Sequence, residues 1–170
     1  MNVLAERSGR RVSVRAPEGP REPLQTKGPI VAAVDASPAS RPVIDAAVRL
    51  AAELAAPLLF VFVRRGPAGF FGSPVYQRRL TKALAGASRV LDRALRAAAH
   101  AGVDAEGEIL EGSPRRRILE FARAREASLI IIGSRRRKLG RSVSRAVARG
   151  ADGPVMVARR NKPALREQTV

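Results

Sequence analysis

The feature that most constrains the fold is the stretch from Ser128 to Ser144, which reads SLIIIGSRRRKLGRSVS. An apolar run ends there at Gly133 and is followed by a strongly basic loop. Ser142 then stands where a new helix would begin, and that helix would turn Val143 and Val147 inward. This order predicts a buried strand, a loop and a helix start. In open α/β sheets, anionic ligands bind at such junctions, because strand carboxyl ends and helix N-termini meet there.

Further apolar runs alternate along the chain with segments of helical periodicity. Short continuous runs of this kind are typical of strands buried on both faces of a parallel sheet. The runs predict a βαβαβαβαβ order, and hence a doubly wound parallel sheet with helices on both faces. The expected strands cover residues 30–35, 58–63, 105–110, 129–132 and 155–158.

Capping residues and breakers place the helices between these strands. Ser37 and Pro38 are expected to be the N-cap and the first residue of the first helix. A long second helix is expected from Tyr76 to Ala101, ending at Gly102. Its inward stripe is expected to be Leu80, Leu84, Ala87, Leu91, Ala94 and Ala98.

Composition excludes several classes of function. The 170 residues suit one domain, and the absence of cysteine excludes disulfides, zinc fingers and thiol nucleophiles. His100 is the single histidine, which argues against a histidine metal site or a serine-histidine triad. Aromatic residues make up 4%, too few for a base-stacking platform. No apolar run is long enough for a membrane span and no signal peptide is evident, so a cytoplasmic location is expected.

The net charge of +17 is large and unevenly distributed. Between Ser113 and Lys162 there are 15 Lys and Arg residues against three acids. Two runs stand out, at 115–117 and 135–138. They suit either solvated faces or nonspecific binding of a polyanion. Residues 1–28 are rich in proline and glycine and predict a disordered basic tail, and residues 161–170 predict a polar tail.

Asp35 and Gly133 end two expected strands, so both would lie at the same edge of a parallel sheet. A carboxylate at Asp35 would accept hydrogen bonds from ribose hydroxyls or help to hold a metal. Equally, it would cap the following turn. The segment from Gly133 to Ser142 suits a phosphate site, or only the turn and cap that every strand–helix junction needs. A P-loop is excluded, because Arg141 stands where that motif requires lysine.

With these elements placed, the chain resembles the universal stress protein family over about residues 29–160. Four stretches carry the resemblance: IVAAVDASPAS at 30–40, AGVDAEGEILEGSPRRRILEFA at 101–122, SLIIIGSRRR at 128–137 and SVSRAVARGADGPVMVAR at 142–159. The resemblance implies an open five-stranded parallel sheet in the order 3-2-1-4-5, of the adenine-nucleotide alpha-hydrolase-like type. It also implies a homodimer formed through the last strand, Val155 to Ala158.

Some members of that family bind ATP, and the resemblance implies where an adenine nucleotide would lie in this chain. The adenosine would meet Ala33, Val34 and Asp35, with Val63 beside the base, and phosphate and ribose would meet Gly133, Ser142 and Val143. The ATP-binding members carry Gly-x2-Gly-x9-Gly followed by Ser or Thr. Here Arg136 replaces the second glycine, and four residues separate it from Arg141 where the motif has nine. Arg136 would crowd the phosphates, although arginines there would also offer them charge-assisted contacts.

These observations lead to one main hypothesis and two alternatives. The main one is a regulatory protein of the universal stress type that binds ATP, with Mg²⁺, or another adenine nucleotide. The first alternative is a nucleotide-free module whose basic surface binds an acidic partner, RNA or an anionic membrane. The second is a slow ATPase that uses Asp35 with a bound metal. An efficient enzyme is not expected, because no general base, nucleophile or metal cluster can be assembled from the sequence.

Overall fold

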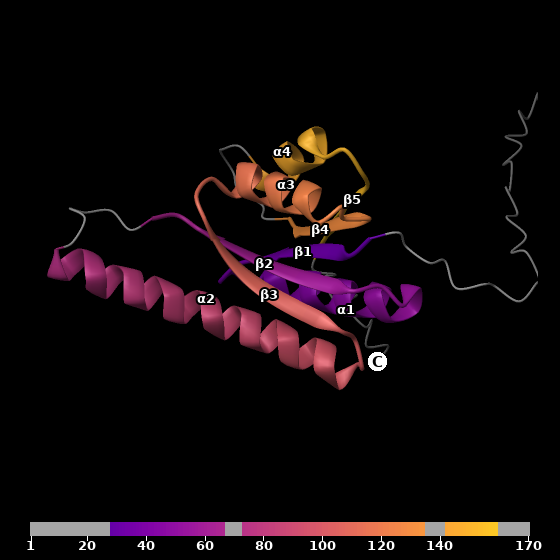
Figure 1. The fold of residues 1–170 in the computed structure, drawn as a ribbon, viewed down its shortest axis with the longest axis horizontal. Coiled ribbons are helices and arrows are strands. Elements are labelled where there is room, and N and C mark those ends of the chain that lie inside the picture. The colour runs from indigo at the N-terminus through magenta and orange to yellow at the C-terminus, as the bar shows by residue number, and fades with distance from the viewer. Residues whose placement is uncertain (1–27, 67–72, 135–141, 160–170) are drawn as a thin grey trace, which may run out of the picture.

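The computed structural model describes residues 28–66, 73–134 and 142–159, which form a central sheet between two layers of helices (Figure 1). Strands and helices alternate along the chain, as the apolar runs predict. The elements are β1 (Ile30–Val34), α1 (Ser40–Leu54), β2 (Leu58–Arg64), α2 (Pro74–His100), β3 (Ala105–Glu111), α3 (Pro114–Ala124), β4 (Leu129–Gly133), α4 (Val143–Gly150) and β5 (Val155–Ala158).

The described residues form a five-stranded parallel sheet in the order β3-β2-β1-β4-β5, which confirms the predicted fold class. β1 is the central strand, and its register places Ala33 opposite Val61 of β2 and Ile132 of β4. The strand order reverses direction at β1, so the crevice above β1 and β4 is the topological switch point of the sheet.

Successive residues of the central strands supply two separate cores. Ile30, Ala32 and Val34 of β1 pack with α1 and α2 on one face of the sheet. Val31 packs with α3 and α4 on the other face. Figure 1 shows the same division, with α1 and α2 on one side of the strands and α3 and α4 on the other. Because both faces are covered, an uninterrupted apolar run was the correct signature for these strands.

The first helix begins later than the sequence predicts. Ser37 and Pro38 were expected to be the N-cap and first helical residue, but α1 begins at Ser40 and its N-cap is Ala39. The intervening residues instead form a turn, in which the Ser40 N–H donates to the Ser37 carbonyl at 3.1 Å. The turn is favoured because the side chain of Asp35 accepts a hydrogen bond from the Ser37 N–H. Ser37 therefore lies in the turn between β1 and α1 and does not cap the helix.

Two side chains expected to face inward are exposed. Leu84 is 37% exposed and Val143 is 38% exposed. The buried residues of α2 begin at Ala87, and the N-terminal end of the helix extends past the sheet in Figure 1. Val143 lies in the first turn of α4, at the rim of a cavity described below. α2 also begins at Pro74, capped by Ser73, two residues earlier than expected.

Other boundaries agree closely with the sequence. Gly102 follows the C-cap of α2 with φ of +67°, a conformation that glycine adopts without a steric penalty. Ser142 is the N-cap of α4, as predicted, and Ser113 is the N-cap of α3. The two predicted tails and the basic run at 135–138 lie outside the described residues, except for Gly28. None of the helices within the described ranges combines the length and apolarity that a membrane crossing requires.

Candidate functional site

A cavity of about 320 Å³ opens where the carboxyl ends of β1, β2 and β4 meet the first turns of α3 and α4. Its size lies at the lower end of the range for small-molecule sites. Charged groups, hydroxyls and apolar side chains all contribute to its wall. The lining residues are Ala33, Val34, Asp35, Ala39, Ser40, Val61, Val63, Arg65, Pro114, Ile118, Ile132, Gly133, Ser142, Val143 and Ser144.

Asp35 is held at the cavity wall by a compact set of hydrogen bonds. Its Oδ1 accepts from the Ser37 N–H at 2.8 Å and from the Ser40 hydroxyl at 3.1 Å. The Ser40 Oγ in turn accepts from the Asp35 N–H at 2.7 Å and lies 2.7 Å from the Asp35 carbonyl oxygen. Ser40 is 5% exposed, so this hydroxyl satisfies buried backbone groups where the strand ends. The carboxylate therefore caps the turn, and Asp35 also lines the cavity.

Gly133 is required because a side chain there would meet the neighbouring backbone. Its φ is not in the left-handed region, so its own conformation does not call for glycine. Instead, a Cβ at this position would lie 2.9 Å from the carbonyl oxygen of Ala39 and 3.3 Å from Cγ2 of Val43. The glycine lets the end of β4 approach the start of α1 closely. The close approach therefore fixes how far the end of β4 lies from the start of α1 beside the cavity.

Replacing Gly133 with alanine is expected to lower the free energy of unfolding by about 1–3 kcal/mol, because backbone must move to admit the methyl group. Urea denaturation measures this loss. Gly86 provides the matched control, since a Cβ there meets nothing within 4 Å and lies inside α2. Gly86→Ala should stabilise by up to about 1 kcal/mol. Equal effects of the two substitutions would contradict the close-approach argument.

The first turn of α4 provides the polar end of the cavity. The Ser142 Oγ accepts from the Arg145 N–H at 3.4 Å and lies 2.7 Å from the Ser144 Oγ. Helix geometry leaves the N–H groups of Val143 and Ser144 without an intrahelical acceptor. These groups, the two hydroxyls and the helix dipole together form an environment suited to an anion.

Apolar side chains form another part of the cavity wall. Val61 and Val63 are two residues apart on β2 and therefore share one face of the sheet. Ile118 of α3 and Ile132 of β4 complete the wall. Arg65 continues the same face of β2 at the cavity rim and is exposed.

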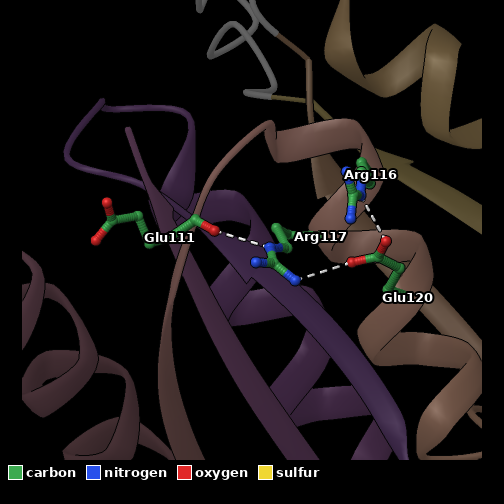
Figure 2. A network of polar contacts seen from close by, with 4 residues as sticks. All are labelled: Glu111, Arg116, Arg117 and Glu120. Atoms are coloured by element: carbon green, nitrogen blue, oxygen red, sulfur yellow. Dashed lines mark hydrogen bonds and ion pairs between the residues drawn. The ribbon is translucent and has the colours of Figure 1, made fainter. Parts of the chain in front are cut away.

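A network of charged side chains fixes the connection between β3 and α3 beside the cavity (Figure 2). Arg117 donates from Nε to the Glu111 carbonyl oxygen at 2.7 Å and from its NH1 group to Glu120 at 3.1 Å. Arg116 donates from Nε to Glu120 at 2.6 Å. This hydrogen bond from Arg116 is the main cause that lowers the pKa of Glu120. Arg116 and Arg117 are exposed, as expected for a solvated face. They also hold the turn between β3 and α3 in place.

The cavity brings together every residue that the sequence singled out for nucleotide contact except Arg136, which lies outside the described residues. Sequence reasoning missed several lining residues, among them Ser40, Val61, Arg65, Ile118, Ile132 and Ser144. Alternation along β2 would have found two of them, Val61 and Arg65, because each lies two residues from Val63, which was already chosen. Ser40 had no such signal, since its position depends on the turn that precedes α1.

Comparisons with known proteins place this geometry in context. The sequence model of the universal stress protein family matches residues 28–159. No curated protein matches the chain. Among solved structures, one similar to this chain is a universal stress protein from Archaeoglobus fulgidus, with 27% identity, a TM-score of 0.64, and coverage of 77% of this chain and 93% of that one.

Two further similar structures contain nucleotides. One is a universal stress protein in complex with cAMP, with 26% identity, a TM-score of 0.58, and coverage of 77% of this chain and 95% of that one. The other is the Archaeoglobus fulgidus universal stress protein in complex with dAMP, with 25% identity, a TM-score of 0.57, and coverage of 78% and 98% respectively.

Proposed function

This chain belongs to the universal stress protein family, and on that premise we propose that its cavity binds an adenine nucleotide. The observation that carries the proposal is the set of groups in the cavity wall. Apolar side chains, a carboxylate-bearing residue and a helix N-terminus all line it. These groups match the base, ribose and phosphate of a nucleotide. A ligand-responsive regulatory role in the stress response follows from such binding.

In this proposal each part of the nucleotide has its own partners. The base lies beside Val63, and the adenosine contacts Ala33, Val34 and Asp35. Asp35 accepts hydrogen bonds from the ribose hydroxyls, while the phosphate receives hydrogen bonds at the start of α4. The complexes of similar proteins with cAMP and dAMP support a nucleotide with one phosphate. The cavity volume of about 320 Å³ also favours a small nucleotide.

ATP with Mg²⁺ is the larger candidate ligand. Asp35 is the carboxylate of the cavity wall, and it would meet a metal that accompanies the nucleotide. Mg²⁺ bound in this way takes one or two carboxylates together with phosphate oxygens and water. Across the described ranges, no three His, Cys, Asp or Glu side chains gather closely enough to hold a metal ion. The metal would therefore depend on the phosphates of ATP for most of its ligands.

Calorimetric titration with AMP, and with ATP in the presence and absence of Mg²⁺, tests the proposal. Binding should also raise the melting temperature, since a ligand at 100 times its Kd stabilises the folded state by about 2.7 kcal/mol. Asp35→Ala should weaken binding, and Asp35→Asn should keep the turn cap while removing the charge. No heat and no thermal shift at millimolar concentrations of either nucleotide would end the proposal.

The nucleotide-free interaction module remains the second candidate function. The observation behind it is the excess of positive charge, +17 for the whole chain. Such a module would bind acidic partners, RNA or anionic membranes with an affinity that ignores nucleotide and falls steeply with salt. Calorimetry distinguishes the two functions, because only the first of them predicts that the protein binds a nucleotide.

We also propose that β5 associates with a second copy of the chain. β5 pairs only with β4 in the described sheet, and its sequence VMVA carries no charge. The other edge strand, β3, carries three glutamates, which discourage edge pairing. Met156 on β5 is 38% exposed and would lie in the interface.

Met156→Lys is expected to convert the proposed dimer to a monomer, because it places a charge within an apolar interface. Light scattering coupled to size exclusion measures the molecular mass. Val75 of α2 is 55% exposed and lies far along the chain from β5, so Val75→Lys serves as a control that adds the same charge. A wild-type chain that is monomeric at micromolar concentrations contradicts the proposal.

A further inference from the structure

The outer face of α2 carries a row of cations that the proposed function does not use. We call this row the basic ridge and define it as Arg78, Lys82, Arg89, Arg93 and Arg96. All five residues are exposed. Their separations of four, seven, four and three residues place them on one side of an α-helix. The buried side of the same helix carries Ala87, Val90, Leu91, Ala94 and Ala98.

The basic ridge differs from the basic surface around α3 in its lack of ion pairs. Arginines of α3, and Arg125 directly after it, form ion pairs with Glu120, Asp152 and Glu108. Among the described residues, no carboxylate lies within 4 Å of a ridge cation in an ion pair. α2 contains one acid, Asp92, against six Lys and Arg residues. The ridge therefore presents its charge to solvent.

This arrangement costs the helix stability. Arg78 and Lys82 are four residues apart, as are Arg89 and Arg93, and Arg96 follows three residues later. Like charges at such spacings destabilise a helix by about 0.2–0.5 kcal/mol for each pair. Asp92 offsets part of this cost for its two arginine neighbours at Arg89 and Arg96. A row of cations that weakens its own helix is more consistent with a partner that neutralises it than with a stabilising role.

The position of the helix makes the ridge accessible to a large partner. α2 forms the outermost element on its side of the sheet, and its N-terminal half extends beyond the strands (Figure 1). From the first to the last cation the ridge spans roughly 27 Å, given a rise of 1.5 Å per residue. Duplex nucleic acid carries about one negative charge per 1.7 Å along its axis, so a duplex lying along the ridge would place many phosphates beside its cations.

We propose that the basic ridge docks on the phosphate backbone of duplex nucleic acid without sequence preference. The chemistry of the face favours this partner over a membrane, because Val75, at the start of the helix, is the one large exposed apolar side chain on this side of α2 that could enter the lipid. It favours a duplex over a single strand, because the ridge has no aromatic ring on which an unpaired base would stack. Binding depends on charge and on the shape of α2.

Fluorescence anisotropy with a labelled 20-base-pair DNA duplex tests this proposal on the full chain. Wild-type affinity should fall several hundred-fold between 50 and 200 mM salt, as expected for about five phosphate contacts. A ridge variant, with Arg78, Lys82, Arg89, Arg93 and Arg96 all replaced by glutamine, should bind at least tenfold more weakly at 50 mM salt. Its dependence on salt should also be shallower. Circular dichroism and AMP titration confirm that the variant is folded.

A second variant controls for net charge. Arg41, Arg115, Arg145, Arg149 and Arg159 are equally exposed, lie outside α2 and do not line the cavity. Their replacement by glutamine removes the same charge and should change affinity for the duplex less than threefold. Equal losses in both variants would overturn the proposal, because binding would then follow net charge. Tighter binding to vesicles containing anionic lipid, or to single-stranded DNA, than to the duplex would overturn it as well.

Discussion

Replacing Phe60 with alanine is expected to lower the free energy of unfolding by about 3–5 kcal/mol. Phe60 lies in the middle of β2 and is 0% exposed, the largest of the fully buried side chains. It belongs to the core between the sheet and the helices α1 and α2. Truncation removes the buried ring and leaves a cavity that neighbouring strands and helices cannot close, because the sheet is held in register on both sides of β2.

Chemical denaturation monitored by circular dichroism measures this loss. Phe62 supplies the matched control, since it lies two residues along the same face of β2 but is only partly buried. Phe62→Ala should cost clearly less than Phe60→Ala. If the two substitutions cost the same, the packing described for this face of the sheet is wrong.

Replacing Ala33 with phenylalanine is expected to weaken the proposed binding of AMP at least 100-fold, or about 2.7 kcal/mol. Ala33 lies at the end of β1 and lines the cavity, between Val61 and Ile132 on the neighbouring strands. The added ring would occupy the space that the adenosine requires. The global fold should survive, because the ring enters an existing cavity and does not replace packed side chains.

Calorimetry measures the loss of affinity, and the melting temperature without ligand shows whether the variant is folded. Ala33→Ser keeps the side chain small and should retain binding within a few-fold. A folded Ala33→Phe protein that binds AMP like the wild type would show that the nucleotide lies elsewhere.

The architecture was predictable from the sequence because its strands are buried on both faces. Runs such as 58–63 and 129–132 can satisfy that environment only in a covered parallel sheet. Helix ends were predictable where a local signal decides them, as at Gly102 and Ser142. The start of α1 was not, because Asp35 and Ser40 form a turn through side-chain hydrogen bonds that compete with a cap at Ser37.

The cavity was predictable in position but not in full. Asp35 and Gly133 were expected at one edge of the sheet from topology alone, and both line the same cavity. The exposure of Leu84 depends on how far α2 extends past the strands, which helical periodicity does not encode. Likewise, the role of Gly133 depends on the approach of α1, a contact between residues distant in the sequence.

The central place of β1 in the sheet has a consequence for synthesis on the ribosome. β1 is the first strand of the described sheet to be made, yet one of its partners, β4, ends at Gly133 and is made after β2 and β3. β2 covers one edge of β1 early, but the other edge has no partner in the nascent chain until β4 emerges. During that interval the growing polypeptide exposes an apolar strand edge, the kind of surface that chaperones bind and that promotes aggregation.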